Sequence, residues 1–411
     1  MPLAGRFRYA SFLSKHNMRV LAAAFVALVL IGCEDPSNVG LGLIGEEGGD
    51  PIRVHLTGSD LPAERVPLIT GSVLSASVFL GPERFLFGIA DDPLFGMIEA
   101  KGYIDFQPPL LAGASFRSGN ITSVQLFLAS GEYVFGDTLA NANMTLTNMD
   151  VAWAAIAVRS DTTLDVGTVA HTFDYVYKDS TLVIDMPDVW IAEYESRILD
   201  VNFVDLFHGF EISAATASAV SGFDASDSFM RVITTTGSGD YRMSKLLTTL
   251  TKTGGLEASS GQTAIQDGFG DNAVLDFNFE VDSLAGSAIS RVVVNVSVDL
   301  AAYDDAPAHF VRPLPQRLDL IGIRENGTRR LLRSASIGED GSVSFVSTTA
   351  SAGEFTIVRS VQRAVTGSSQ FEKYAVTIVE SQAAIGAALI DNSASESGGP
   401  DVIITLVPSP F

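Results

Sequence analysis

Short runs of hydrophobic and β-branched residues, separated by clusters of Gly, Asn, Asp and Ser, fill the chain from about Arg53 onward. The clearest runs are residues 121–128, 181–186 and 229–236. Side chains alternate between the two faces of a strand, and small polar residues favour turns. Many short strands at close spacing are typical of antiparallel sandwiches. The sequence therefore predicts an all-β protein of jelly-roll-like β-sandwiches with a few short helices.

The second half of this pattern echoes the first. Each half runs through two strand-like segments, a helix-like stretch, a central strand and a last strand, and matched elements begin 159 to 173 residues apart. The first half has Tyr103-Ile-Asp-Phe, 121–128, 196–207, 209–212 and 229–234; the second has Val274-Leu-Asp-Phe, 289–296, 355–365, 374–378 and 402–407. The echo predicts two tandem sandwiches, at 53–238 and 263–411. A Thr-, Ser- and Gly-rich linker is expected at 239–262.

The first 33 residues do not follow this pattern. Four basic residues and no acidic residue precede Glu34, and Val20 to Ile31 is an unbroken apolar run. A basic start, a short apolar run and small residues at its end are the marks of a cleaved secretory signal. We expect residues 1–32 to be that signal, with Met18 as an alternative start.

Leu30-Ile31-Gly32-Cys33, which closes the apolar run, resembles the lipobox of bacterial lipoproteins. The resemblance implies cleavage before Cys33 and attachment of lipid, including palmitate-type acyl chains, to that cysteine. Several acyl chains together make a stable membrane anchor. Residues 33–52, rich in Gly, Glu and Asp, are then expected to form a lipidated flexible tether.

The net charge of the chain limits which classes of partner it can bind. The chain carries a net charge of −22, and removal of residues 1–32 takes away four basic and no acidic residues, which brings it to −26. Such a surface repels phosphate backbones and anionic headgroups. We therefore expect no nucleic-acid partner.

Several segments resemble a family of uncharacterised Bacteroidota-type lipoproteins, filed as domain of unknown function 4270. The segments that carry the resemblance are 33–41 (Cys33-Glu-Asp-Pro-Ser-Asn-Val-Gly-Leu), Asp92-Pro-Leu-Phe-Gly with Ala100 and Tyr103, Gly136-Asp-Thr, Phe207-His-Gly-Phe-Glu-Ile and Arg312-Pro-Leu-Pro-Gln-Arg-Leu-Asp-Leu. The layout is also similar to jelly-roll modules of secreted carbohydrate-binding proteins. These likenesses imply an outer-membrane β-sandwich lipoprotein and no reaction. Glu34 and Asp35, directly after the lipidated cysteine, resemble the signal for display on the cell surface.

Candidate binding residues are few. Trp190, beside Asp188 and Glu193, is the better candidate for an exposed platform on which a sugar ring stacks; Trp153 lies among apolar residues, which favours the core. Glu193 and Glu195 would share one face of a strand, where paired carboxylates suit glycosidase chemistry at the right separation. A solvated acidic face is the plainer interpretation of this pair.

Known catalytic and metal motifs are missing from the sequence. There is no HExxH, no GxSxG and no GxxxxGK[ST], so no catalytic residue is assigned. No cofactor is expected, although loop carboxylates are ligands that calcium prefers. The weak calcium candidates are Asp224 with Asp227 and Asp304 with Asp305.

Three functions remain open at this point. The first is a non-catalytic lipoprotein that binds a partner in the envelope or organises it. The second is an accessory protein that binds polysaccharide. The third is a glycan hydrolase that uses loop carboxylates. An exposed aromatic side chain next to amides and carboxylates on a sheet favours the second, whereas two convergent carboxylates in a cleft favour the third.

Overall fold

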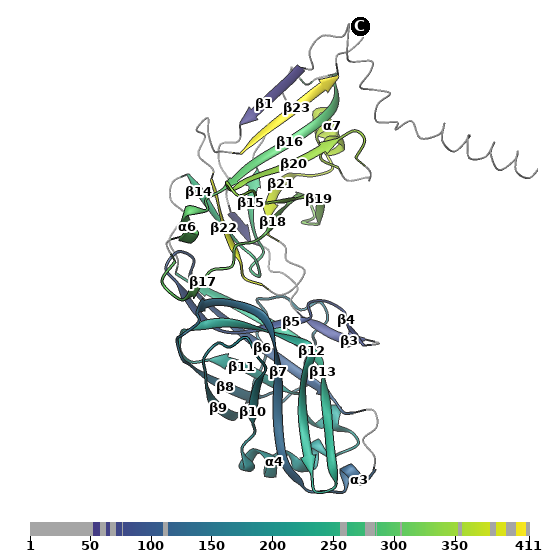
Figure 1. Ribbon diagram of the computed structural model, residues 1–411. Coiled ribbons are helices and arrows are strands. Elements are labelled where there is room, and N and C mark those ends of the chain that lie inside the picture. Colours follow the sequence, from purple (N-terminus) through teal and green to yellow (C-terminus); the bar gives the residue numbers. More distant parts are fainter. Residues whose placement is uncertain are drawn as a thin grey trace, which may run out of the picture. The chain divides into compact units, whose positions relative to one another are not determined.

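A computed structural model gives the fold of the chain (Figure 1). It describes residues 52–57, 63–65, 71–75, 77–109, 114–254, 261–275, 284, 286–304, 306–351, 356–378, 384–391 and 400–407. Strands make up most of this part of the chain, and the helices are short. The prediction of an all-β sandwich fold with a few short helices is confirmed.

The first sandwich is built from one continuous set of paired strands that folds around a core. Its strands are β3 (Ser72–Ser75), β4 (Val78–Phe79), β5 (Arg84–Asp92), β6 (Gly96–Gln107), β7 (Ile121–Asp137), β8 (Ala142–Asn148), β9 (Val169–Tyr175), β10 (Leu182–Asp185), β11 (Phe210–Ala214), β12 (Ala219–Thr234) and β13 (Gly237–Thr253). The short strand β17 (Phe310–Val311) also pairs with β7. Its helices are α3 (Ala114–Arg117), α4 (Asp188–Ile198) and α5 (Phe203–Leu206).

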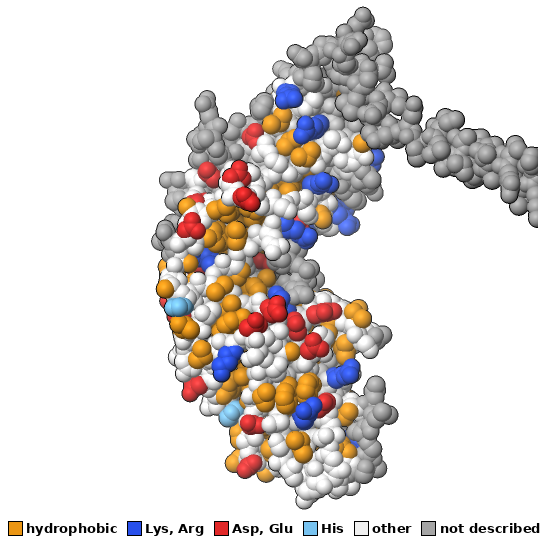
Figure 2. All heavy atoms as spheres, viewed as in Figure 1, with side chains coloured by type: hydrophobic (Ala, Val, Ile, Leu, Met, Phe, Trp, Pro, Cys, Tyr) orange, Lys and Arg blue, Asp and Glu red, His pale blue; other side chains and the backbone are white. Residues whose placement is uncertain are grey.

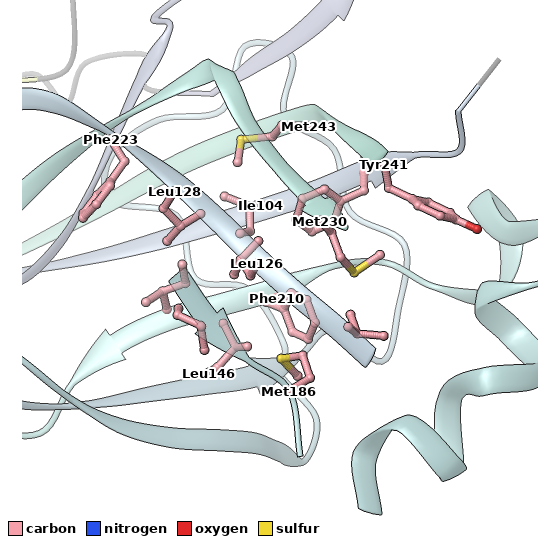
Figure 3. Packing of buried hydrophobic residues seen from close by; sticks show 14 of the residues in the cluster. Ile104, Leu126, Leu128, Leu146, Met186, Phe210, Phe223, Met230, Tyr241 and Met243 are labelled. Atoms are coloured by element: carbon pink, nitrogen blue, oxygen red, sulfur yellow. The ribbon is translucent and has the colours of Figure 1, made fainter. Parts of the chain in front are cut away.

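Long strands that change partners along their length wrap this sheet around its core. Strand β12 pairs with β7 along one edge, and along the other edge with β5 near its start and with β13 near its end. Both β5 and β13 pair with β6, so these pairings form a closed circuit. Leu126 and Leu128 of β7 are buried together with Phe223 and Met230 of β12, as Figure 3 shows. A register shift between Asp224 and Phe229 changes which alternate positions of β12 face inward.

The second sandwich consists of two sheets around a separate core. One sheet has the order β1-β23-β16-β22-β14, with β20 also paired to β16, and the other has the order β19-β18-β21-β15-β2. These strands are β1 (Ile52–Thr57), β2 (Ala63–Arg65), β14 (Gln262–Gln266), β15 (Asp271–Leu275), β16 (Ala288–Val298), β18 (Arg317–Ile323), β19 (Arg329–Ser336), β20 (Ser342–Thr348), β21 (Lys373–Thr377), β22 (Ala387–Asp391) and β23 (Asp401–Val407). Helix α6 spans Ala301–Asp304 and α7 spans Ile357–Val365.

Equivalent strands pair in the same way in both sandwiches. Strand β11 lies between β6 and β8, and β21 lies between β15 and β18. Likewise β8 pairs with β9 as β18 pairs with β19, and β7 pairs with β10 as β16 pairs with β20. Even a register shift recurs, with one extra residue in β9 opposite Leu146 and Thr147, and one in β19 opposite Leu320 and Ile321. The two sandwiches therefore share one pairing order.

Two predicted boundaries need correction. Residues 239–253, expected in a linker, form most of β13, whose side chains Tyr241, Met243 and Leu246 are buried in the first core. The Thr- and Ser-rich composition hid this strand, because polar residues occupy many of its outward positions. Residues 53–57 and 63–65, expected to open the first sandwich, instead belong to β1 and β2, which pair within the sheets of the second.

Residues 53–406 form one compact unit, in which side chains from both sandwiches meet. Arg312 binds Asp92 through two hydrogen bonds of 2.7 Å, and the Arg312 side chain is only 4% exposed. The same guanidinium donates to the carbonyl oxygen of Ala302, while Asp92 accepts from the N–H groups of Leu94 and Phe95. Asp92 and Arg312, which begin two of the segments that carry the family resemblance, therefore form one buried ion pair.

Candidate functional site

Trp190 is not an exposed platform. It lies on α4, is 4% exposed, and stacks on Tyr194 with ring centroids 4.9 Å apart. Its Nε1–H donates to Oδ1 of Asn148 at 2.9 Å. The prediction of a sugar-stacking role at Trp190 is wrong, because the helix turns this side chain into the first core.

Glu193 and Glu195 do not form a pair on one face, because their segment is helical rather than extended. Glu193 is exposed, whereas Oε1 of Glu195 accepts a hydrogen bond from the N–H of Ile121 at 2.6 Å. In the second sandwich Oε1 of Gln362, on α7, accepts from the N–H of Ile289 at 2.8 Å. Glu195 thus holds the start of strand β7, as Gln362 holds the start of strand β16 in the second sandwich.

The calcium candidates are not brought together with further ligands. Within the described ranges, no group of three or more His, Cys, Asp or Glu side chains is placed to hold a metal ion. Asp224 lies near Arg84, and burial raises the pKa of Asp224. Asp227 and Asp304 are exposed, and Asp305 lies outside the described residues.

Cys33, the predicted signal at 1–32 and residues 34–51 of the predicted tether also lie outside the described residues, whereas Ile52 begins β1. In the part of the chain that the structure does describe, no helix has both the length and the apolar character needed to cross a bilayer.

A buried polar cluster lies on β6 and its neighbours, on the side away from the main core. Asp105 accepts a hydrogen bond of 2.7 Å from Nζ of Lys245, and this ammonium group lies over the ring of Trp153. Burial raises the pKa of Asp105, although Lys245 opposes this shift. Trp153 itself is only 7% exposed, in agreement with the core position that its apolar neighbours predicted. Its Nε1–H donates to the carbonyl oxygen of His208.

The surface with the best binding chemistry is the outward side of β10, β7, β12 and β13, which we name the outer face. Strand register places two rows of side chains across it. One row is Val183, Phe127, Phe229 and Arg242; the next is Asp185, Gln125, Arg231 and Asp240. Their sequence neighbours Leu126, Leu128 and Met230 point into the core.

Aromatic and polar groups alternate on the outer face in a fixed arrangement. The rings of Phe127 and Phe229 stack with centroids 4.7 Å apart, and the guanidinium of Arg231 lies about 5 Å from both. Arg231 donates two hydrogen bonds to the Asp240 carboxylate, at 2.7 and 2.9 Å. Nε2 of Gln125 donates to Asp185 at 2.8 Å. These contacts fix the polar groups around the aromatic pair before any ligand arrives.

An open hollow of about 500 Å³ adjoins the outer face at the β12–β13 hairpin. It is lined by Arg231, Ile233, Thr234, Gly237, Ser238, Gly239 and Asp240. Figure 2 shows hydrophobic, basic and acidic side chains next to one another over β7, β12 and β13. The hollow and the aromatic pair together offer apolar contact beside hydrogen-bond donors and acceptors, which is how ligand sites combine affinity with orientation.

The sequence held a partial signal for this surface. Segments 121–128 and 229–236 were both identified as strands, and the alternation within each already put Phe127 and Phe229 opposite the core positions. What the sequence did not reveal was that these two strands are neighbours in register. Comparison with known protein families, curated proteins and solved structures finds no match to the chain.

Proposed function

We propose that this protein is exported, anchored by lipid on Cys33 to the outer membrane, and serves as a non-catalytic binding protein at the cell envelope. The sequence Leu30-Ile31-Gly32-Cys33 after the apolar run supports the anchor. The outer face supports the binding role, because partly exposed aromatic rings are held there beside charged and amide groups.

The anchor is tested on the protein extracted from its own cells. We expect the mature N-terminal peptide to begin at Cys33 and to carry the added mass of a diacylglycerol and an acyl chain. We also expect Cys33→Ser to move the protein from the membrane fraction to the soluble fraction. An unmodified Cys33, or an intact chain before it, would contradict the proposal.

A polysaccharide is the second part of the proposal, as the ligand of the outer face. Sugar rings present apolar C–H faces and a rim of hydroxyl groups, which matches the Phe127–Phe229 pair beside Gln125, Asp185 and Asp240. The acidic surface of the chain favours a neutral glycan over an anionic one, because like charges repel.

A glycan array probed with residues 34–411 tests this ligand. We expect binding that Phe229→Ala with Gln125→Ala reduces at least tenfold, while circular dichroism stays unchanged. Tyr177→Ala, a partly exposed aromatic residue off the outer face, is the matched control. Release of reducing ends from a bound glycan would favour the hydrolase instead, and equal losses in control and test variants would place the ligand elsewhere.

A further inference from the structure

Arginine side chains gather on one edge of the second sandwich, although the whole chain is acidic. Strand β19 carries Arg329, Arg330 and Arg333, and helix α7 carries Arg359 and Arg363 without any acidic residue. Both elements contact the same strand, β20 (Ser342–Thr348). Figure 2 shows Lys and Arg side chains over the region where Figure 1 draws α7 and β19, while acidic side chains gather over β14 and α6.

The geometry of these elements turns the charges outward. Strand β19 is the end strand of its sheet, and Arg330 and Arg333 are exposed. Arg359 and Arg363 are four residues apart on α7, so they share a helix face opposite the buried Val358 and Val361. Between the β19 arginines, Leu331 is 55% exposed. We name this surface, with its exposed leucine, the arginine edge.

Acidic groups near the arginine edge lie mostly at its margins, and Glu64 of β2, which is close to Arg329, forms an ion pair with Lys373 at 2.5 Å. Glu325 lies in the β18–β19 turn, and Glu339 and Asp340 lie in the β19–β20 turn, so they flank β19 at its two ends. Asp319, on β18, lies 3.9 Å from Arg317. The carboxylate of Asp340 is also engaged by the backbone N–H and the hydroxyl of Ser342.

The same sandwich receives the chain directly from the anchor. Strand β1 begins at Ile52 and pairs with β23 of the second sandwich. Residues 34–51 can span at most about 65 Å even when fully extended. If Cys33 carries lipid, as proposed above, the second sandwich is the folded part that the chain ties first to the bilayer.

We infer that the arginine edge binds the anionic phospholipid headgroups of the membrane in which the protein is anchored. Guanidinium groups form paired hydrogen bonds with phosphate oxygens, and an exposed leucine among arginines suits the boundary between headgroups and acyl chains. The inference rests on the proposed anchor. It adds a second contact that orients the second sandwich on the membrane and leaves the outer face of the first sandwich available for ligand.

Without residues 1–32 the chain carries a net charge of −26, which predicts repulsion from anionic headgroups. The distance over which charges act decides between this repulsion and the attraction of the nearby arginines. At physiological salt, charges separated by more than about 8 Å are largely screened from each other. A headgroup at the arginine edge therefore experiences the nearby arginines much more strongly than the distant carboxylates of the first sandwich. Each basic side chain near an anionic surface strengthens binding on the order of fivefold.

The test uses residues 34–411 without lipid, so that failure of the anchor and failure of this inference remain distinguishable. The protein is floated with vesicles of phosphatidylethanolamine containing about a third phosphatidylglycerol, and with vesicles of phosphatidylcholine alone. The test variant carries Arg333→Gln, Arg359→Gln and Arg363→Gln. The control variant carries Arg159→Gln, Lys178→Gln and Arg197→Gln, which remove the same charge from exposed positions of the first sandwich.

We expect the unsubstituted protein to float with the phosphatidylglycerol vesicles, to stay behind with phosphatidylcholine, and to lose binding as salt rises. We expect the test variant to bind at least tenfold more weakly and the control variant to bind as the parent does. Equal loss in both variants, or no preference for phosphatidylglycerol, would overturn the inference. So would retention by a soluble anionic polysaccharide, lost in the test variant, without binding to vesicles.

Discussion

The two sandwiches share a strand order but differ in the source of one edge. In the first, β12 runs through a hairpin into β13, which then pairs with β6. In the second, β23 and β15 pair with β1 and β2, which come from the other end of the sequence. In the first sandwich the strand next to β12 thus comes from a local hairpin. In the second, the strands next to β23 and β15 come from a distant part of the sequence. The second half should therefore depend on residues that lie far from it in sequence.

Deletion of residues 34–65 should break this comparison most strongly. Without β1 and β2, the edges of β23 and β15 lose their backbone partners, and each lost hydrogen bond costs about 1 kcal/mol. We expect the second sandwich to lose on the order of 5 kcal/mol, while the first keeps its stability. Hydrogen exchange followed by mass spectrometry reports each half separately. Equal deprotection of β12 and β23 would show that the two halves do not differ in this way.

Arg312→Ala should separate the halves more selectively. It leaves Asp92 buried and unpaired, which costs about 3 to 5 kcal/mol. We expect a single calorimetric transition to split into two, one for each sandwich. Asp92→Leu with Arg312→Met, which removes both charges, should recover much of the loss. A single transition in Arg312→Ala would mean that the remaining contacts are enough to couple the two cores.

Glu195→Ala and Gln362→Ala sharpen the comparison at equivalent positions. Each removes the acceptor for the N–H at the start of a strand, Ile121 or Ile289, at a cost of about 1 to 3 kcal/mol. Urea denaturation should give losses of similar size. Ser196→Ala, an exposed neighbour on α4, is the control and should change little. A loss in only one variant would mean that the shared hydrogen bond does not stabilise both halves.

The pH dependence of Asp105 is the smallest expected difference, and it belongs to the first sandwich. Because burial raises the pKa of Asp105 above its usual 3.8, the folded protein holds this proton more firmly than the unfolded chain. The free energy of unfolding should then fall as the pH rises from about 3.8 through the raised pKa. Asp105→Asn should remove this component, and exposed Asp161→Asn should keep it. Parallel profiles for the parent and Asp105→Asn would contradict the raised pKa.

Much of the fold could be predicted because it rests on local pattern. The β-branched and hydrophobic pattern in 121–128 and 229–236 identified two strands, and the echo between the halves gave a common order of elements along the chain. The candidate binding site was harder to predict from the sequence than the fold. Trp190 was placed on a surface because its charged neighbours Asp188 and Glu193 suggested exposure, but on a helix those neighbours point away from the side that meets the core.

The sequence by itself determined the strand-rich class, the position of several strands and the motif at Cys33, because these depend on residues close together in the chain. Only the tertiary structure decided that β1 and β2 close the second sandwich, that Asp92 meets Arg312, and that Phe127 stacks on Phe229. The physical reason is that pairing between strands is set by contacts over many residues of separation. Backbone hydrogen bonds between strands are the same whatever the side chains are. The partner of a strand is therefore decided by how side chains pack in the whole core.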